Sequence, residues 1–104
     1  MIIRLVKMTF HEKYSEQFEL LFAAVKSDIA SFEGCQQVEL LAESTKDSKA
    51  IYFTRSIWNK ESNLESYRSS DLFAITWKST KALFADRPQA WTTQLIAKAT
   101  SDRK

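Results

Sequence analysis

The chain has 104 residues, of which 44% are hydrophobic and 12% aromatic, and these values fit one globular domain with a single core. Its 15 Lys and Arg residues nearly balance its 13 Asp and Glu residues, and the two signs are interspersed. Because no basic stripe is present, nucleic acid is not an expected partner. No apolar stretch is long enough to span a membrane, so we expect no membrane partner either.

Cysteine, histidine and glycine each occur once in the chain, and this excludes several kinds of binding site. Cys35 is the one cysteine and His11 the one histidine, so the chain offers no closed zinc site. Gly34 is the one glycine, which excludes a glycine-rich phosphate cradle. The N-terminus lacks an apolar run followed by a cleavage site. We therefore expect a cytoplasmic protein with no metal and no organic cofactor.

The first half of the chain predicts a strand, a helix and a hairpin. Residues 2–10 are rich in β-formers and apolar on both alternating faces, which predicts a covered strand. Ser15 is a plausible helix cap, and Gly34 should end that helix. Apolar residues recur between them at helical spacing: Phe18, Leu21, Phe22, Val25, Ile29 and Phe32. Residues 35–43 and 50–58 alternate as strands around a polar hairpin loop at 44–49.

The second half predicts two helices and a last strand. Asn59 can cap a short helix that ends near Arg68, and Ser69 or Ser70 can cap a longer one that ends near Ala85. Pro88 forbids further helix, so residues 89–97 should form the last strand.

This order of elements predicts an α+β fold of ferredoxin-like type, with a four-stranded antiparallel sheet and helices on one face. The uncovered face is expected to expose an apolar patch that is too large for a monomer. The expected members of this patch are Val6, Met8, Phe10, Phe53 and Ile57. A second copy placed face to face by a two-fold axis would bury it, so the predicted partner is the chain itself, as a homodimer.

Three short stretches carry a family resemblance. They are Phe-Glu-Gly-Cys at 32–35, Trp58 at the end of the third strand, and Ser-Tyr-Arg-Ser-Ser-Asp-Leu-Phe at 66–73. On these marks the chain resembles the antibiotic-biosynthesis monooxygenase group of dimeric α/β barrels, over residues 1 to about 98. The resemblance implies one such domain over 1–104 with a frayed tail, and an apolar pocket between helices and sheet. The haem-degrading branch is a poor match, because its axial histidine would fall at Trp77.

Tyr67, Asn63 and Lys7 are the candidate catalytic residues. Tyr67 joins an apolar ring to one polar atom, and it either donates to a substrate or packs on the core with its hydroxyl at the surface. Asn63 lies one helical turn before Tyr67, a spacing that resembles the cofactor-free oxygenases, although it also suits a solvated residue. Lys7 interrupts a strand face expected to look toward the helices, where a buried amine would hold an anion unless it reaches the rim.

Trp58, Trp77, Phe73 and Arg68 are the candidate substrate-binding residues. Large aromatic side chains can form walls for a flat substrate, and they serve equally as ordinary core. Arg68 can bind a carboxylate or phenolate oxygen, or remain in a surface ion pair.

Two functions remain open on these residues. The first is a cofactor-independent monooxygenase that acts on a small aromatic or quinol-like substrate in an apolar pocket. The second is a non-catalytic dimer that binds a small apolar ligand or whose pocket is filled by Trp77, with an isomerase on the same fold as a further possibility.

Overall fold

The computed structural model describes residues 1–43 and 49–102, with the side chain of Lys49 excepted. Within these residues the chain forms strands, α-helices and one short 3-10 helix. In chain order they are β1 (Ile2–His11), η1 (Glu12–Tyr14), α1 (Ser15–Ala30), β2 (Cys35–Ala42), β3 (Lys49–Trp58), α2 (Glu61–Arg68), α3 (Asp71–Lys81) and β4 (Gln89–Gln94).

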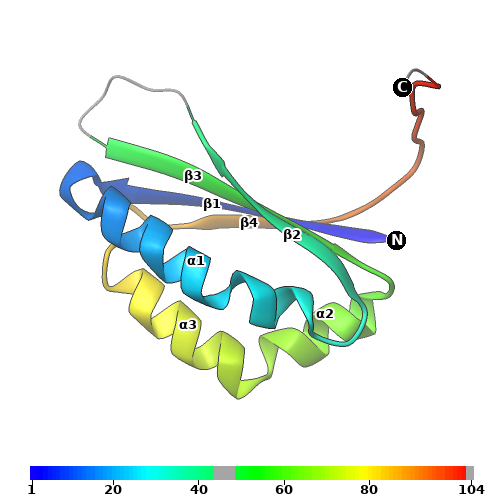
Figure 1. Cartoon of the computed structure of the whole chain (residues 1–104), viewed down its shortest axis with the longest axis horizontal. Coiled ribbons are helices and arrows are strands. Elements are labelled where there is room, and N and C mark those ends of the chain that lie inside the picture. Colours follow the sequence, from blue (N-terminus) through cyan, green and yellow to red (C-terminus); the bar gives the residue numbers. More distant parts are fainter. Residues whose placement is uncertain (44–48, 103–104) are drawn as a thin grey trace.

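The strands form one antiparallel sheet in the order β2-β3-β1-β4. The three α-helices all lie against the same face of this sheet, so the molecule has two layers (Figure 1). This is the predicted α+β ferredoxin-like fold, and the prediction is confirmed. No helix among residues 1–43 and 49–102 is long and apolar enough to cross a membrane.

The core lies between β1, β3, α1 and the segment after α3. Its buried side chains are Met8, Phe10, Phe18, Tyr52 and Leu83. The ring of Phe10 stacks on Phe18 with 4.3 Å between ring centroids. The backbone N–H of Ala85 donates to the carbonyl oxygen of Thr9 at 2.8 Å, which ties the segment after α3 to β1.

The faces of β1 differ from the sequence-based assignment. Met8 and Phe10 are buried against the helical layer, and Val6 packs beside them. The prediction that these three residues belong to the uncovered face is therefore wrong. Since side chains alternate along a strand, Lys7 lies on the uncovered face, where its register partners are Phe53 and Gln89. The expectation that Lys7 looks toward the helices is also wrong, because both faces of β1 are largely apolar and alternation alone does not distinguish them.

The first helix is shorter than predicted. It begins at Ser15, but Tyr14 occupies the cap position and no side chain caps the end. It ends at Ala30, before Phe32 and Gly34. Gly34 has a φ of +84°, and a Cβ at this position would overlap the side chain of Asn63. Glycine is therefore required in this turn both by its backbone conformation and by the side chain packed against it.

The remaining boundaries are partly confirmed. Lys60, not Asn59, occupies the cap position of α2. Ser70 caps α3 as predicted, because its hydroxyl accepts the backbone N–H of Phe73 at 3.1 Å. Helix α3 ends at Lys81 instead of Ala85, and β4 ends at Gln94 instead of Ala97. Apart from Lys49, the predicted hairpin loop at 44–49 lies outside the described residues.

Candidate functional site

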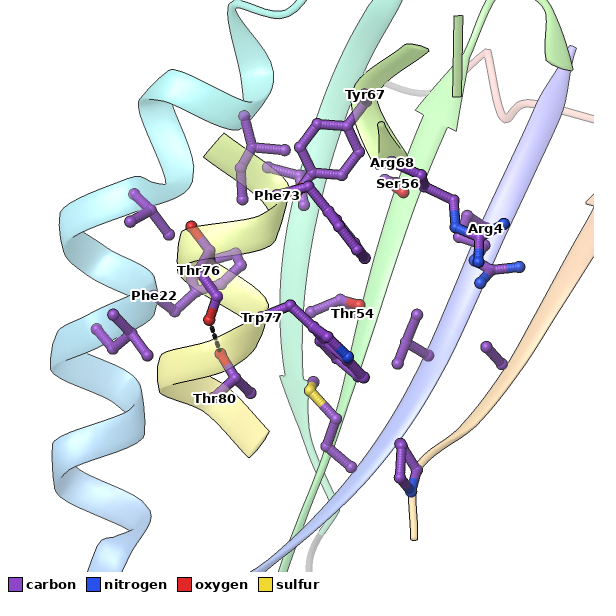
Figure 2. Close-up of a pocket in the computed structure, with 18 of the residues that line it drawn as sticks. Arg4, Phe22, Thr54, Ser56, Tyr67, Arg68, Phe73, Thr76, Trp77 and Thr80 are labelled. Atoms are coloured by element: carbon purple, nitrogen blue, oxygen red, sulfur yellow. Dashed lines mark hydrogen bonds between the residues drawn. The ribbon is translucent and has the colours of Figure 1, made fainter. Parts of the chain in front are cut away.

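A cavity of about 350 Å³ lies between the helical layer and the sheet (Figure 2). Its helical wall is formed by apolar residues of α1, which the three- and four-residue spacing brings onto one face. These are Phe18, Leu21, Phe22, Val25 and Ile29. Its floor is formed by side chains of the sheet that share the helix-facing side. These are Arg4, Val6, Met8, Val38, Thr54, Ser56 and Ala90.

Four of the seven candidate residues line this cavity: Tyr67, Arg68, Phe73 and Trp77. Figure 2 shows that they come from α2 and α3 and lie between these helices and the sheet. Phe73 and Trp77 stack nearly parallel, with 5.9 Å between ring centroids and an interplanar angle of 12°. Trp77 forms part of the wall, and the cavity remains beside it.

Trp58 does not line the cavity, but its ring packs against Tyr67, which does. It is fully buried, and its ring stacks on that of Tyr67 at 5.2 Å. The indole N–H of Trp58 donates to Oγ of Ser56 at 2.9 Å, which fixes the orientation of the indole. Phe32 and Phe73 meet Tyr67 edge-on at 5.5 and 5.3 Å. Three aromatic contacts therefore hold the Tyr67 ring at the cavity wall.

Asn63 and Lys7 are not among the residues that line the cavity. The side chain of Asn63 packs against Gly34, so closely that it would overlap a Cβ at that position. Lys7 lies on the opposite face of the sheet, between Phe53 and Gln89. The structure thus brings neither residue to Tyr67 within the cavity.

Burial raises the pKa of Tyr67 to about 12, with a further contribution from the nearby Cys35. At neutral pH the phenol is therefore protonated, and it can donate a hydrogen bond but does not act as a base. Burial also raises the pKa of the Cys35 thiol, so the thiol is not activated as a nucleophile.

Arg4 is a residue of the cavity that the sequence did not single out. It is half-buried on β1, and Figure 2 shows its guanidinium beside Arg68 and Ser56 at one end of the cavity. The signal for it was present, because Arg4 is the charged residue on the β1 face that also carries Val6, Met8 and Phe10. Thr54, Thr76 and Thr80 add further polar atoms that no motif indicated.

The raised tyrosine pKa values predict a loss of stability in alkali. Burial raises the pKa of Tyr52 to about 12, with the Glu19 carboxylate, which accepts its O–H, as the next cause. In the unfolded chain both tyrosines titrate near pH 10. Between pH 10 and 12 the unfolded chain therefore binds fewer protons than the folded protein, so the free energy of unfolding falls as pH rises.

Chemical denaturation at neutral pH and at about pH 11 measures this loss. Tyr67→Phe is the internal control, because it removes one titrating group and should reduce the fall relative to the unmodified chain. An equal fall in the two proteins would contradict the assignment to Tyr67.

Comparison with known proteins places the chain in a family. Residues 1–78 match the model of the family described as antibiotic biosynthesis monooxygenase. The match covers most of the chain, so the chain belongs to the antibiotic biosynthesis monooxygenase family. No curated protein gives a significant sequence match.

Solved structures with very different sequences share the fold. One, described as a putative antibiotic biosynthesis monooxygenase from Deinococcus radiodurans, has a TM-score of 0.84 at 8% identity and covers 97% of this chain and 98% of its own. A second of the same description, from Caulobacter crescentus, has a TM-score of 0.81 at 15% identity over 92% of this chain and 90% of its own. A third, from Nitrosomonas europaea, has a TM-score of 0.78 at 13% identity over 93% of this chain and 100% of its own.

Proposed function

We propose that the chain is a monooxygenase that uses neither a metal nor an organic cofactor and acts on a small aromatic or quinol-like substrate. Family membership supports the reaction class. The observation that carries the proposal is the cavity of about 350 Å³, whose walls are largely apolar and aromatic and whose charged groups, Arg4 and Arg68, lie at one end (Figure 2). A cavity of this kind holds a flat ring and orients its polar substituent.

In the proposed reaction the substrate supplies the electrons. A phenol binds with its oxygen at the Tyr67 hydroxyl and loses its proton to water, and Tyr67 donates a hydrogen bond to the resulting phenolate. The phenolate reduces O2, and a new carbon–oxygen bond forms at the ring carbon opposite the hydroxyl. The second oxygen atom leaves as water with the two displaced hydrogens. A phenol and O2 thus give a quinone and water, and the apolar wall protects the intermediates from solvent.

Oxygen consumption with 1-naphthol tests this proposal. We expect uptake above the uncatalysed rate, conversion to 1,4-naphthoquinone, and one atom of isotopically labelled O2 in each product molecule. Ligand binding without oxygen uptake, across a panel of naphthols and hydroquinones, would contradict the oxygenase and favour a non-catalytic binding protein. Conversion of a substrate without oxygen uptake would favour an isomerase.

The uncovered sheet face supports a homodimer. In register it carries apolar side chains from all four strands: Ile3, Leu5, Leu41, Ile51, Phe53, Ile57 and Trp91. Leu41 is 45% exposed and Trp91 47% exposed, so the face presents large apolar groups to solvent in one copy. A patch of this kind marks an interaction surface. A second copy packed face to face would cover it through a self-complementary interface.

Native mass spectrometry of the purified protein tests the dimer. We expect twice the chain mass at micromolar concentration. Phe53→Glu would place a carboxylate from each copy in the apolar interface, and it should convert the protein to a folded monomer. An unmodified chain that remains monomeric at all concentrations would overturn this part of the proposal.

A further inference from the structure

The charged residues at one end of the cavity are both arginines. Among the described residues that line it, Arg4 and Arg68 carry charge, and none is an aspartate or a glutamate. They come from different layers, since Arg4 lies on β1 and Arg68 ends α2. Figure 2 shows the two side chains extending toward one another beside Ser56.

Neither guanidinium is held in a strong ion pair, so each can still bind an anion. Nη1 of Arg4 donates to Oγ1 of Thr92 at 2.7 Å, which anchors the side chain to β4 through a neutral oxygen. Nη1 of Arg68 lies 3.4 Å from Oε1 of Glu65, an ion pair with both side chains well exposed. Such an exposed pair is weak. Among the residues that the structure describes, Glu65 is therefore the negative neighbour that the two positive charges share at this end of the cavity.

The two guanidiniums also act on one another. Burial lowers the pKa of Arg4, and the positive charge of Arg68 lowers it further, while Glu65 opposes the shift. Arg4 is half-buried and Arg68 is exposed, so solvent screens part of their repulsion, and an anion bound between them would relieve the remainder. Guanidinium groups match carboxylate oxygens in geometry as well as in charge.

We propose that the cavity selects an aromatic acid, whose carboxylate binds between Arg4 and Arg68 while its ring lies against Phe73 and Trp77. Identifying this acid as the substrate rests on the proposed function, whereas the binding preference does not. A hydroxyl on the ring carbon next to the carboxylate would then face Tyr67, which directly precedes Arg68 on α2. The preferred substrate is thus an ortho-hydroxy aromatic acid, rather than a neutral phenol.

Isothermal calorimetry with two probes of equal shape tests the selection. The probes are 2-naphthoate and its neutral amide, 2-naphthamide, each titrated into the purified protein at neutral pH. We expect the acid to bind about tenfold or more tightly than the amide, which is the usual size of one charge-assisted hydrogen bond. Arg4→Gln and Arg68→Gln should each weaken the acid about tenfold and leave the amide within about twofold.

Arg87→Gln is the matched control, because Arg87 is exposed in the segment before β4 and does not line the cavity. This variant should bind both probes as the unmodified chain does. Equal affinity for acid and amide, or an equal loss for both probes in the two cavity variants, would overturn the proposal. So would failure of both probes to bind.

Oxygen uptake separates this inference from the proposed function. With 1-hydroxy-2-naphthoate, the balanced reaction with O2 gives 2-carboxy-1,4-naphthoquinone and water. We expect a kcat/KM for this acid about tenfold or more above that for 1-naphthol, and the preference should disappear in Arg4→Gln. Selective binding of the acid without oxygen uptake would leave the anion site standing and overturn the oxygenase. Equal oxygen uptake with both compounds would support the oxygenase and overturn the preference for an acid.

Discussion

Replacing Tyr67 by phenylalanine should lower kcat/KM for oxygen uptake by roughly tenfold or more while leaving the fold intact. The exchange removes one oxygen atom and keeps the ring that stacks on Trp58 and meets Phe32 and Phe73 edge-on. The aromatic packing around the site should therefore survive. In the proposed reaction, the variant would lose the hydrogen bond from the Tyr67 phenol to the substrate oxygen on which negative charge develops.

Tyr14→Phe provides the control for Tyr67→Phe. Tyr14 precedes α1, contacts His11 and Lys13, and does not line the cavity. Its loss of a hydroxyl should leave oxygen uptake unchanged. A Tyr67→Phe variant whose kcat/KM stays within about twofold of the unmodified chain would remove Tyr67 from the mechanism.

The pH dependence of turnover distinguishes a donor from a base at this position. With a pKa of about 12, Tyr67 is protonated throughout the physiological range. If it donates to the phenolate, the rate follows the ionisation of the substrate hydroxyl, and the phenylalanine variant shows the same profile at a lower level. If it acted as the base, the unmodified chain would gain rate with each pH unit toward pH 12 and the variant would not.

The order of elements could be read from the sequence because local signals agree with the fold. The spacing of Phe18, Phe22 and Val25 indicates one helix face, and the Ser70 hydroxyl caps α3 as the sequence predicted. Helix ends were less predictable. Gly34 tolerates a left-handed conformation, but the chain leaves the helix four residues earlier, and the glycine serves a turn packed against Asn63. That contact joins parts of the chain distant in sequence, and no local pattern reveals it.

The sequence indicated the helical residues of the site but not those of the sheet, again because a contact between distant parts of the chain decides the latter. Tyr67 and Phe73 lie in the 66–73 stretch that carries the family resemblance, and Trp77 follows Phe73 one turn later on α3. Arg4 and Lys7 sit on one strand with opposite orientation, and both of its faces are largely apolar. Which cation enters the cavity depends on which face α1 covers. This is decided by the fully buried contact of Phe10 with Phe18, a tertiary interaction.

Phe10→Ala should accordingly be among the most destabilising truncations, at about 3–5 kcal/mol in the free energy of unfolding. The ring of Phe10 is fully buried, stacks on Phe18, and meets Tyr52 and Phe84 at 5.8 and 5.3 Å. Removing it leaves a cavity that joins β1, α1 and the segment after α3, and none of these can close over the space without moving the others. The free energy of unfolding of natural domains is about 5–15 kcal/mol, so this one substitution would remove a large part of it.

Urea denaturation at one fixed protein concentration measures this loss, because the stability of the proposed dimer would depend on concentration. Ile75→Ala is the control, since Ile75 is 70% exposed on α3 and its truncation should change the free energy of unfolding by less than about 0.5 kcal/mol. A loss below about 1 kcal/mol for Phe10→Ala would mean that the Phe10–Phe18 stack does not fix the face of β1. In that case the orientation that admits Arg4 and excludes Lys7 would have to come from the sheet pairing with β3 and β4 alone.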